Sequence, residues 1–303
     1  MEKLLEPFLK KHGFKARVVP AERLKELESD FNAVLDRGLI NRQVYKSYLK
    51  WFKFMGPEDT GDTNSIIILA MPRPMHRLWF SYKDKNTAVI IPPTYMHYRR
   101  TNRDIFKLLK KWMNSVKYSL SMARLPLKLL AVRSGLAKYG RNNIAYIEKW
   151  GSFYQLIGFY SNCISNNDPW QDIKSLDACR ICTLCIESCP TGAISKERFV
   201  LDAEKCLTFL NESKGNMPTW VLPGVHNSLI GCMKCQLICP YNKDVKKWIE
   251  DIGEFDSKET EILLKSGNGK NKDLRIVKKL KDLGVYEYLN VMPRNLRLLI
   301  KDL

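Results

Sequence analysis

The chain has 303 residues, with 50 Lys and Arg against 32 Asp and Glu, and so a formal net charge of +18. Its 45% hydrophobic and 11% aromatic fractions exclude a disordered chain, and its length is ample for a sizeable core. No apolar run approaches the ~18 residues that span a bilayer, and the N-terminus lacks a basic segment followed by an apolar one. The sequence therefore predicts a cytoplasmic protein with no membrane segment.

The first 60 residues have the hydrophobic spacing of helices. Apolar side chains recur at three- and four-residue steps between Leu24 and Leu35, and Gly38 is expected to end that helix. Asn41 is expected to cap a second helix, which continues to Met55. This part of the chain is therefore predicted to be helical.

Strands and helices alternate in the next part of the chain. The apolar run 65–71 predicts a buried strand, and residues 87–91 predict a second strand that ends at a pair of prolines. Residues 104–118 and 125–136 have helical spacing, and residues 135–143 are too rich in glycine and amides to continue a helix.

Three domains follow from this order of elements. Helices are also expected around Leu280 and from Pro293 onward. We therefore predict an α+β domain over residues 1–170, a cysteine-rich domain over 171–245 and a short helical tail over 246–303.

The cysteines are the most informative residues. Cys163 stands alone, and the other eight of the nine lie between positions 179 and 239. Clustered cysteines in a cytosolic chain are typical of metal binding, so no disulfides are expected.

The spacing of the eight cysteines is that of a bacterial two-cluster ferredoxin. Residues 179–190 read C-x2-C-x2-C-x3-C-P, and residues 232–240 read C-x2-C-x3-C-P after a single Cys206. Three thiolates at two-residue intervals fit one cubic cluster, and the fourth ligates the other cluster. The first cluster is expected to take Cys179, Cys182, Cys185 and Cys239, and the second Cys189, Cys206, Cys232 and Cys235.

Zinc is the alternative, because paired C-x2-C motifs also bind zinc. The two C-P endings and the ferredoxin order of the eight ligands favour two 4Fe–4S clusters. Such clusters pass single electrons, so a further site is needed to accept them.

Other motifs carry a family resemblance. They are the loop Gly-Leu-x-x-x-Gly-x-Asn at 135–142, Gly151-Ser152-Phe153, the segment 206–210 and the segment 231–240. With the cysteine block they resemble the epoxyqueuosine reductases, cobalamin-dependent enzymes related to the reductive dehalogenases. The resemblance implies a nitroreductase-like domain that binds a base-off corrinoid, followed by the two-cluster domain.

By this resemblance the loop after residue 134 and the Gly-Ser pair line the corrinoid site. The residues concerned are Gly135, Leu136, Gly140, Asn142, Asn143 and Ser152. Small residues let the backbone approach a flat macrocycle, and asparagine side chains can meet its amide arms. The alternative is a turn that ends a helix and binds no ligand.

One feature departs from the family. Epoxyqueuosine reductases carry an aspartate general acid shortly before the glycine loop, whereas residues 118–124 here contain no acid. Tyr118, Tyr95 and His97 are the candidate proton donors in its place.

Two functions from different classes remain open. The first is a cobalamin-dependent reductase that receives electrons from a donor such as ferredoxin or flavodoxin and acts on an organic substrate. The second is a non-catalytic electron carrier that reduces a partner protein's corrinoid or flavin. The positive charge favours a polyanionic partner, and the resemblance implies tRNA as a possible substrate. The candidate phosphate contacts are Arg99, Arg100, Lys107, Lys110, Lys111, Lys278, Lys279 and Lys281, and the alternative is that these lysines form solvated helix faces.

Overall fold

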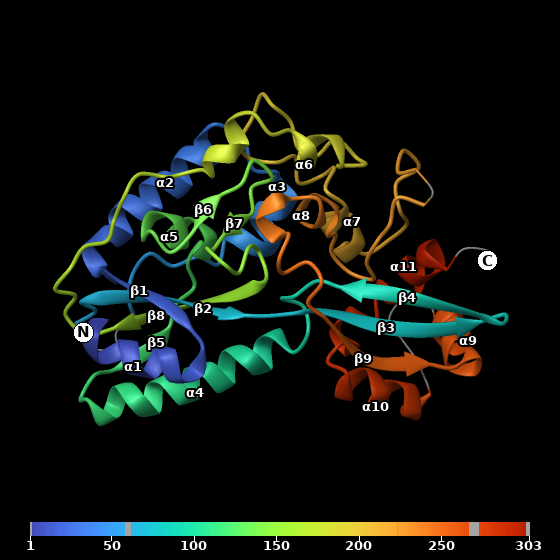
Figure 1. Ribbon diagram of the computed structural model, residues 1–303, viewed down its shortest axis with the longest axis horizontal. Helices are drawn as coiled ribbons and strands as arrows, with labels where there is room; N and C mark the ends of the chain where they lie inside the picture. Colours follow the sequence, from blue (N-terminus) through green and yellow to red (C-terminus); the bar gives the residue numbers. More distant parts are fainter. Residues whose placement is uncertain (1, 58–61, 223, 267–272, 301–303) are drawn as a thin grey trace. The chain divides into compact units, whose positions relative to one another are not determined.

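The computed structural model describes residues 2–57, 62–222, 224–266 and 273–300 (Figure 1). The chain forms two compact units, each built from separate stretches of sequence. The first unit holds Met1–Pro72, Arg99–Thr183 and Arg198–Asp202, and the second holds Arg73–Tyr98, Leu184–Glu197 and Ala203–Leu303. Within the described ranges, none of the helices combines the length and the apolar character that crossing a membrane requires.

An antiparallel sheet with the strand order β1-β2-β8-β5 forms the centre of the first unit. Its strands are β1 (Lys15–Pro20), β2 (Ser65–Pro72), β8 (Tyr154–Ser161) and β5 (Leu120–Met122). Side chains of β2 alternate between two cores: Ile66 and Ile68 enter one, and Ile67 and Leu69 enter the other. Burial on both faces explains why the sequence of β2 is a continuous apolar run.

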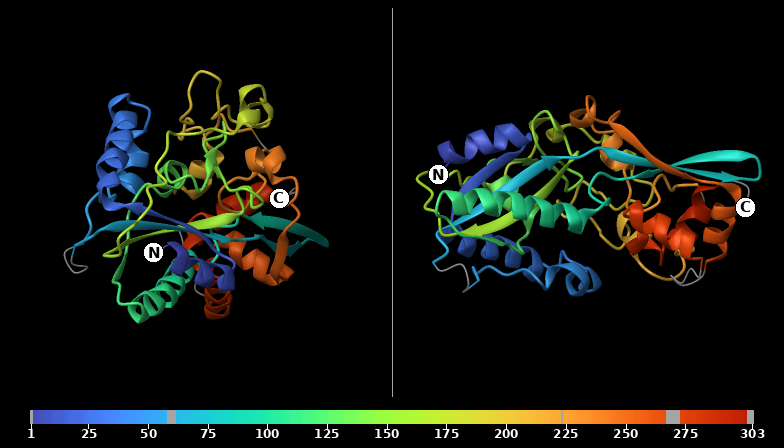
Figure 2. Two further views of the ribbon diagram at one scale, coloured as in Figure 1. Left: turned by 60° about the vertical axis from the view of Figure 1, so that its left-hand side comes forward. Right: turned by 90° about the horizontal axis from the view of Figure 1, so that it is seen from below.

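Helices cover both faces of this sheet (Figures 1 and 2). α1 (Glu2–His12) and α4 (Tyr98–Ser115) pack with Phe159 on one face, whereas α2 (Leu24–Asp36) and α5 (Leu127–Arg133) pack on the other. The unit also contains α3 (Arg42–Val44), η1 (Ala21–Arg23), η2 (Tyr45–Leu49), η4 (Asp177–Arg180) and the β6–β7 hairpin (Lys138–Tyr139 and Ala145–Tyr146). This layered mixture of helices and strands confirms the predicted α+β fold.

The second unit is built on a sheet with the order β4-β3-β9. Its strands are β3 (Met75–Tyr82), β4 (Lys85–Ile91) and β9 (Ile249–Phe255), with β9 parallel to β3. The helices α9 (Ser257–Lys265), α10 (Leu274–Asp282) and α11 (Met292–Leu299) share a core with this sheet. The unit also holds α6 (Leu184–Glu187), α7 (Leu207–Glu212), α8 (Lys234–Leu237), η5 (Pro240–Asn242) and η6 (Tyr286–Tyr288).

Most of the predicted helices and strands are present. α2 is followed by Gly38 with a φ of 62°, and Asn41 caps α3 by accepting hydrogen bonds from the backbone of Gln43 and Val44. The predicted strands 65–71 and 87–91 correspond to β2 and β4, and the predicted helices 104–118 and 125–136 to α4 and α5.

Three expectations about local structure were wrong. The first 60 residues are not wholly helical, because β1 pairs with β2 along its whole length. The helix after Asn41 ends at Leu49 rather than Met55, since the Lys53 amide bonds to the Arg124 carbonyl at 2.8 Å instead of continuing a helix. The helical tail begins with a strand, β9, whose partner is β3.

The compact units divide the chain differently from the predicted domains. The β3–β4 hairpin belongs to the second unit because β3 pairs with β9 from the C-terminal part of the chain. The domain limits at residues 170 and 245 were predicted from sequence motifs and do not coincide with the limits of the compact units, so they stay predictions.

Candidate functional site

Four of the predicted cluster ligands, Cys189, Cys206, Cys232 and Cys235, lie in the second unit. Burial, together with smaller effects of the thiols of Cys206 and Cys189, raises the pKa of Cys232 to about 11. Burial also raises the pKa of Cys235, with added contributions from Cys232, Cys206, Cys189 and Cys185. The thiols of the second unit are therefore within electrostatic range of one another, and the division of the ligands between two clusters stays a prediction from the motif.

The short helix α7 carries the first of these thiols at its N-terminus. Cys206 is the N-cap residue of α7, and its sulfur accepts hydrogen bonds from the backbone N–H groups of Thr208 and Phe209. Burial is the larger effect and leaves the pKa of Cys206 raised. The end of α7 therefore positions a sulfur among donors that can stabilise a thiolate.

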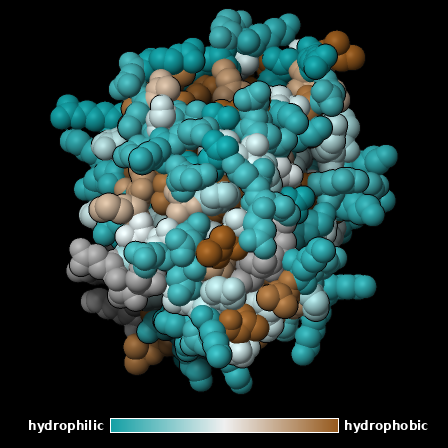
Figure 3. Space-filling model, turned by 90° about the vertical axis from the view of Figure 1, so that its left-hand side faces the viewer, coloured by the Kyte–Doolittle hydropathy of each residue, from teal (hydrophilic) through white to brown (hydrophobic). Residues whose placement is uncertain are grey.

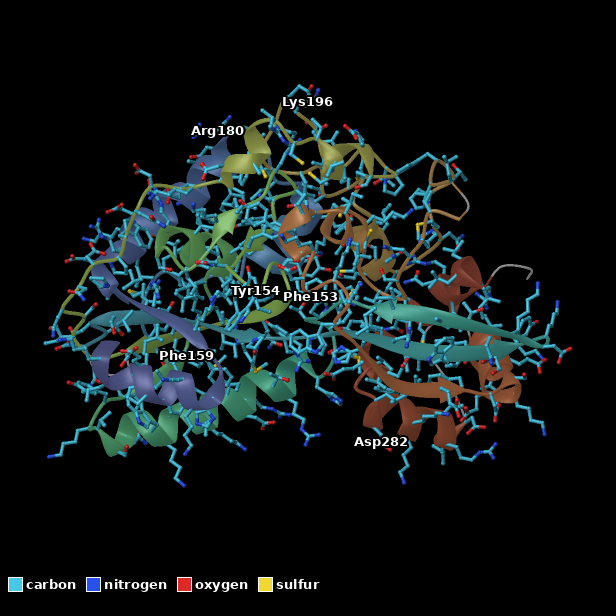
Figure 4. The ribbon with its side chains drawn as sticks, viewed as in Figure 1. Phe153, Tyr154, Phe159, Arg180, Lys196 and Asp282 are labelled. Atoms are coloured by element: carbon cyan, nitrogen blue, oxygen red, sulfur yellow. The ribbon has the colours of Figure 1, made fainter. Side chains whose placement is uncertain are left out.

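Cys179 and Cys182 lie in the first unit, at η4 and just after it. The guanidinium of Arg141 donates hydrogen bonds to the backbone carbonyls of both residues. The distance from Arg141 Nε to the Cys182 carbonyl oxygen is 3.2 Å. Arg180, between the two cysteines, has an exposed side chain at the periphery of the ribbon (Figure 4). Arg141 therefore fixes the peptide groups of the loop that carries these two ligands.

The other two predicted ligands of the first cluster, Cys185 on α6 and Cys239 before η5, belong to the second unit. Within that unit α6 packs against α8, which carries Cys235. The ligation of one cluster by Cys179, Cys182, Cys185 and Cys239 stays a prediction from the motif.

The glycine- and amide-rich loop folds as the tight β6–β7 hairpin. The Gly140 amide donates to the Ile144 carbonyl at 2.7 Å, and Asn143 at the turn has a φ of 59°. A Cβ on Gly140 would lie 2.6 Å from the ring of Tyr146, so glycine is required there for packing within the hairpin. Gly135 is exposed and has a φ of 70°, which favours glycine at that position.

The predicted corrinoid residues differ in exposure. Asn142 is buried, and its amide donates to the Tyr146 hydroxyl at 2.8 Å. Leu136 and Ser152 are also buried, the former in the core of the first unit. Asn143 is only half-buried. The contact of these residues with a corrinoid stays a prediction, and the structure gives Gly140 and Asn142 a role within the hairpin as well.

The segment after the Gly-Ser pair packs into the interior of the first unit. Figure 4 labels Phe153, which precedes β8, and Tyr154 and Phe159 on β8, and all three are buried. The Tyr154 hydroxyl donates to the carbonyl of Ala145 in the hairpin at 2.7 Å. β8 therefore holds the hairpin in place from within the same unit.

The three candidate proton donors lie in different units. Tyr118 is half-buried in the first unit and packs against the core beside α4. Tyr95 lies in the second unit, where its hydroxyl donates to the Glu212 carboxylate. Burial raises the pKa of Tyr95 well above its ordinary value, and the charge of Glu212 adds to this effect. His97 has a φ of 50° and lies against Gly284.

Sequence reasoning missed three residues around the cysteines. They are Arg141, Glu212 and Arg294, which bind the backbone or a side chain of segments near the predicted ligands. Arg141 lies inside the glycine loop, and this position was the one feature of the sequence that could have indicated a role for it near the site. For Glu212 and Arg294 no local pattern indicated a partner.

Comparisons with known proteins agree with this arrangement. A family model described as "4Fe-4S double cluster binding domain" matches residues 178–242. An epoxyqueuosine reductase of Francisella cf. novicida (strain Fx1) is 35% identical over 114 residues, which cover 37% of this chain and 31% of the relative. The chain thus spans about a third of the length of the first curated relatives it matches.

Solved structures share the fold. That of epoxyqueuosine reductase from Streptococcus thermophilus matches with a TM-score of 0.70 at 19% identity, over 98% of this chain and 80% of that one. A crystal structure of epoxyqueuosine reductase with a tRNA-Tyr epoxyqueuosine-modified tRNA stem loop matches with a TM-score of 0.64 at 22% identity, over the same shares. This chain thus contains a double-cluster binding domain, is similar in sequence to epoxyqueuosine reductases over part of their length, and shares the fold of their solved structures.

Proposed function

We propose that the chain is an iron–sulfur, cobalamin-dependent reductase in which two 4Fe–4S clusters pass electrons to a corrinoid and then to an organic substrate. The observation that carries this proposal is the presence of Cys189, Cys206, Cys232 and Cys235 in one compact unit, inside a match to a double-cluster domain. Four thiolates per cluster are the usual ligand set of 4Fe–4S centres, which transfer electrons.

The residues around the second cysteine group fit a cluster. Burial favours the protonated thiols of Cys206, Cys232 and Cys235 when no iron is bound, so iron binding must displace their protons. The two backbone N–H groups that reach Cys206 would stabilise its sulfur in the bound state. Cluster binding and folding are therefore expected to be coupled.

The β6–β7 hairpin and its flanks are proposed to hold the corrinoid. Exposed backbone at Gly135 and the half-buried Asn143 suit a flat macrocycle with amide arms. The buried residues Leu136, Gly140, Asn142 and Ser152 would keep the loop in shape from within. When bound, cobalamin supplies a strongly reducing cobalt centre. Tyr118 is the proposed proton donor, with Tyr95 and His97 as the remaining candidates.

The substrate class that we propose is a modified nucleoside in tRNA. Lys107, Lys110 and Lys111 are exposed on α4, and the fold is shared with a reductase crystallised with a tRNA stem loop. The face in Figure 3 is mostly hydrophilic, with hydrophobic side chains in small separate groups. Both the charge and the fold support a polyanionic partner. A cytoplasmic location and a ferredoxin or flavodoxin as the electron donor complete the proposal.

One observation favours the second candidate function, a non-catalytic electron carrier. Gly140 and Asn142, two of the predicted corrinoid residues, already have partners inside the hairpin. An electron carrier would need the two clusters but no corrinoid site.

The experiment that separates the two functions starts from protein whose clusters are reconstituted anaerobically. Cobalamin is added, the protein is passed through gel filtration, and iron and corrinoid are measured. A reductase retains about one corrinoid per chain, whereas a carrier retains iron alone. Asn143→Ala should weaken corrinoid retention, and the exposed Asn167→Ala serves as the matched control. Retention unaffected by Asn143→Ala would place the corrinoid elsewhere.

A further inference from the structure

Arg294, on the last helix α11, binds the segment that follows Cys206. All five of its N–H donors are used. They reach the carbonyls of Leu210 at 2.9 Å, Asn211 at 3.2 Å, Ser213 at 2.9 Å and Gly215 at 2.7 Å, and the side chain of Asn295 at 3.0 Å. A guanidinium has five such donors, so none is left over.

The carbonyls that Arg294 binds lie at the C-terminal end of α7. The last carbonyls of a helix have no partner within the helix, and a cation is favoured beside them. At the other end of α7, backbone N–H groups donate to the sulfur of Cys206. One short helix therefore connects the arginine to a predicted cluster ligand.

Two buried asparagines extend the connection to a second ligand. Asn295, next to Arg294, donates to the carbonyls of Asn211 and Leu229, each at 2.8 Å. Asn211, on α7, donates to the carbonyl of Gly231 at 2.8 Å, and Gly231 precedes Cys232. Both asparagines are 0% exposed, so these bonds are made away from water.

We infer that Arg294 is a positioning residue for the second cluster: by holding α7 it fixes Cys206 and, through Asn211, the backbone before Cys232. The C-terminal helix is thereby part of the cluster site, although it carries no ligand. The inference rests on the ligand set of the second cluster given above. Replacing the arginine leaves several carbonyls without partners and lets Cys206 move away from its iron.

A displaced Cys206 has a defined chemical consequence. In a cluster held by Cys189, Cys206, Cys232 and Cys235, a loosened Cys206 would make the iron bound to this sulfur the one lost as Fe²⁺ when ferricyanide takes up one electron and becomes ferrocyanide. A three-iron cluster with one unit less of positive charge would remain. The three-iron cluster is paramagnetic, so electron paramagnetic resonance detects it.

The test compares variants of the full chain loaded with clusters. After brief ferricyanide treatment, Arg294→Ala should lose about one iron per chain and show the three-iron signal, because one cluster of the pair has a loosened ligand. Arg294→Lys keeps the charge but not the planar fork, and should not restore the cluster. Arg297→Ala is the matched control, since Arg297 lies on the same helix and donates to the Leu264 carbonyl of α9.

Each outcome decides the inference. If Arg294→Ala keeps its iron as the wild type does, the inference is wrong. Equal iron loss in Arg297→Ala would also overturn the inference, because α11 would then affect only the general stability of the unit. If Arg294→Ala does not fold, Arg294→Gln, which keeps part of the hydrogen bonding, is judged by the same signal. A wild-type protein that forms no clusters would refute the proposed function itself, a result distinct from the failure of this inference.

Discussion

The guanidinium of Arg141 donates a 3.2 Å hydrogen bond to the backbone carbonyl of Cys182. It also binds the carbonyl of Cys179, the preceding cysteine of the motif. A side chain of the glycine loop therefore sets the peptide orientation of the first C-x2-C turn. Because hydrogen bonds to charged groups are the stronger ones, this interaction has consequences for cluster retention.

Arg141→Ala should weaken the binding of the first cluster. Hydrogen bonds to a charged group contribute about 1.5–3 kcal/mol, which corresponds to roughly ten- to a hundredfold faster iron release to a chelator. Arg180→Ala is the control, because Arg180 lies in the same turn but its side chain is exposed and pairs with Asp177 at 3.7 Å. Equal release from both variants would show that Arg141 does not hold the turn.

The cysteine spacing predicts about eight iron and eight sulfide per chain, with an electron paramagnetic resonance signal of two coupled reduced clusters. Cys206→Ala and Cys239→Ala should each damage a different cluster and lower solubility, since metal binding and folding are coupled. Cys163→Ala should keep both clusters, because the buried Cys163 sulfur lies 2.9 Å from the Ser65 hydroxyl and outside the motif. Tightly bound zinc without sulfide would contradict the prediction.

Sequence patterns predicted the elements whose signal is local. The apolar run of β2 and the caps at Gly38 and Asn41 depend on neighbouring residues, and all three are present. β9 was missed because its acidic residues obscure the alternation of a strand. Asp251, on β9, is bound by Arg77 of β3 through two hydrogen bonds of 2.6 Å. The pairing that makes β9 a strand thus comes from a distant part of the chain.

The same division holds for the candidate site. Motif spacing alone groups Cys189, Cys206, Cys232 and Cys235 into one predicted ligand set, and all four lie in the second unit. The hydrogen bond from Arg294 to the carbonyl of Leu210 spans 84 residues of sequence, and no periodicity records such a pair. Spacing predicts which residues are ligands, whereas the groups that hold the ligand segments leave no pattern in the sequence.

His76 should make the second unit less stable at acid pH. Burial, with smaller effects of the charges of Arg73 and His97, lowers the pKa of His76 to about 4. The folded pKa lies below the ordinary value of about 6.5, so the unfolded chain binds more protons between these limits. Stability is therefore complete above pH ~6.5 and falls as the pH decreases toward ~4.

Urea unfolding of cluster-loaded protein at pH 7.5 and 5.5 measures this effect. His76 should account for a loss of up to about 1 kcal/mol at the lower pH, part of which solvent screening removes. His76→Gln should reduce the pH dependence, and His12→Gln, on α1 of the other unit, is the control. An unchanged slope in His76→Gln would assign the acid sensitivity to other groups.

The exposed lysines of α4 should bind the phosphates of tRNA. Changing Lys107, Lys110 and Lys111 to Glu should weaken binding and flatten its salt dependence, with a slope change of roughly 0.7–0.9 for each phosphate that is no longer neutralised. A variant with Lys83, Lys85 and Lys258 reversed has the same net charge and exposed positions in the second unit. Equal weakening in both variants would indicate an effect of net charge rather than of α4.

The last prediction concerns the absent general acid. Reduction of an epoxide requires a proton on the leaving oxygen, and a general acid contributes roughly 10²–10⁴-fold to such a step. Residues 118–124 contain β5 (Leu120–Met122), and besides Tyr118 their polar side chains are two serines and an arginine, of which serine hydroxyls are weak acids and a guanidinium is a poor proton donor. Tyr118, at the start of this stretch, is half-buried and is the strongest acid available in it.

We therefore predict that this protein turns over epoxyqueuosine tRNA slowly or not at all and that it prefers a different substrate. The measurement is single-turnover conversion of epoxyqueuosine tRNA by the cobalamin-loaded protein, followed by nucleoside analysis. Any residual rate should fall in Tyr118→Phe, which keeps the ring and removes the proton, and should persist in Tyr45→Phe, a tyrosine of the same unit whose side chain is exposed. Rapid turnover that survives Tyr118→Phe would show that a group outside residues 118–124 supplies the proton.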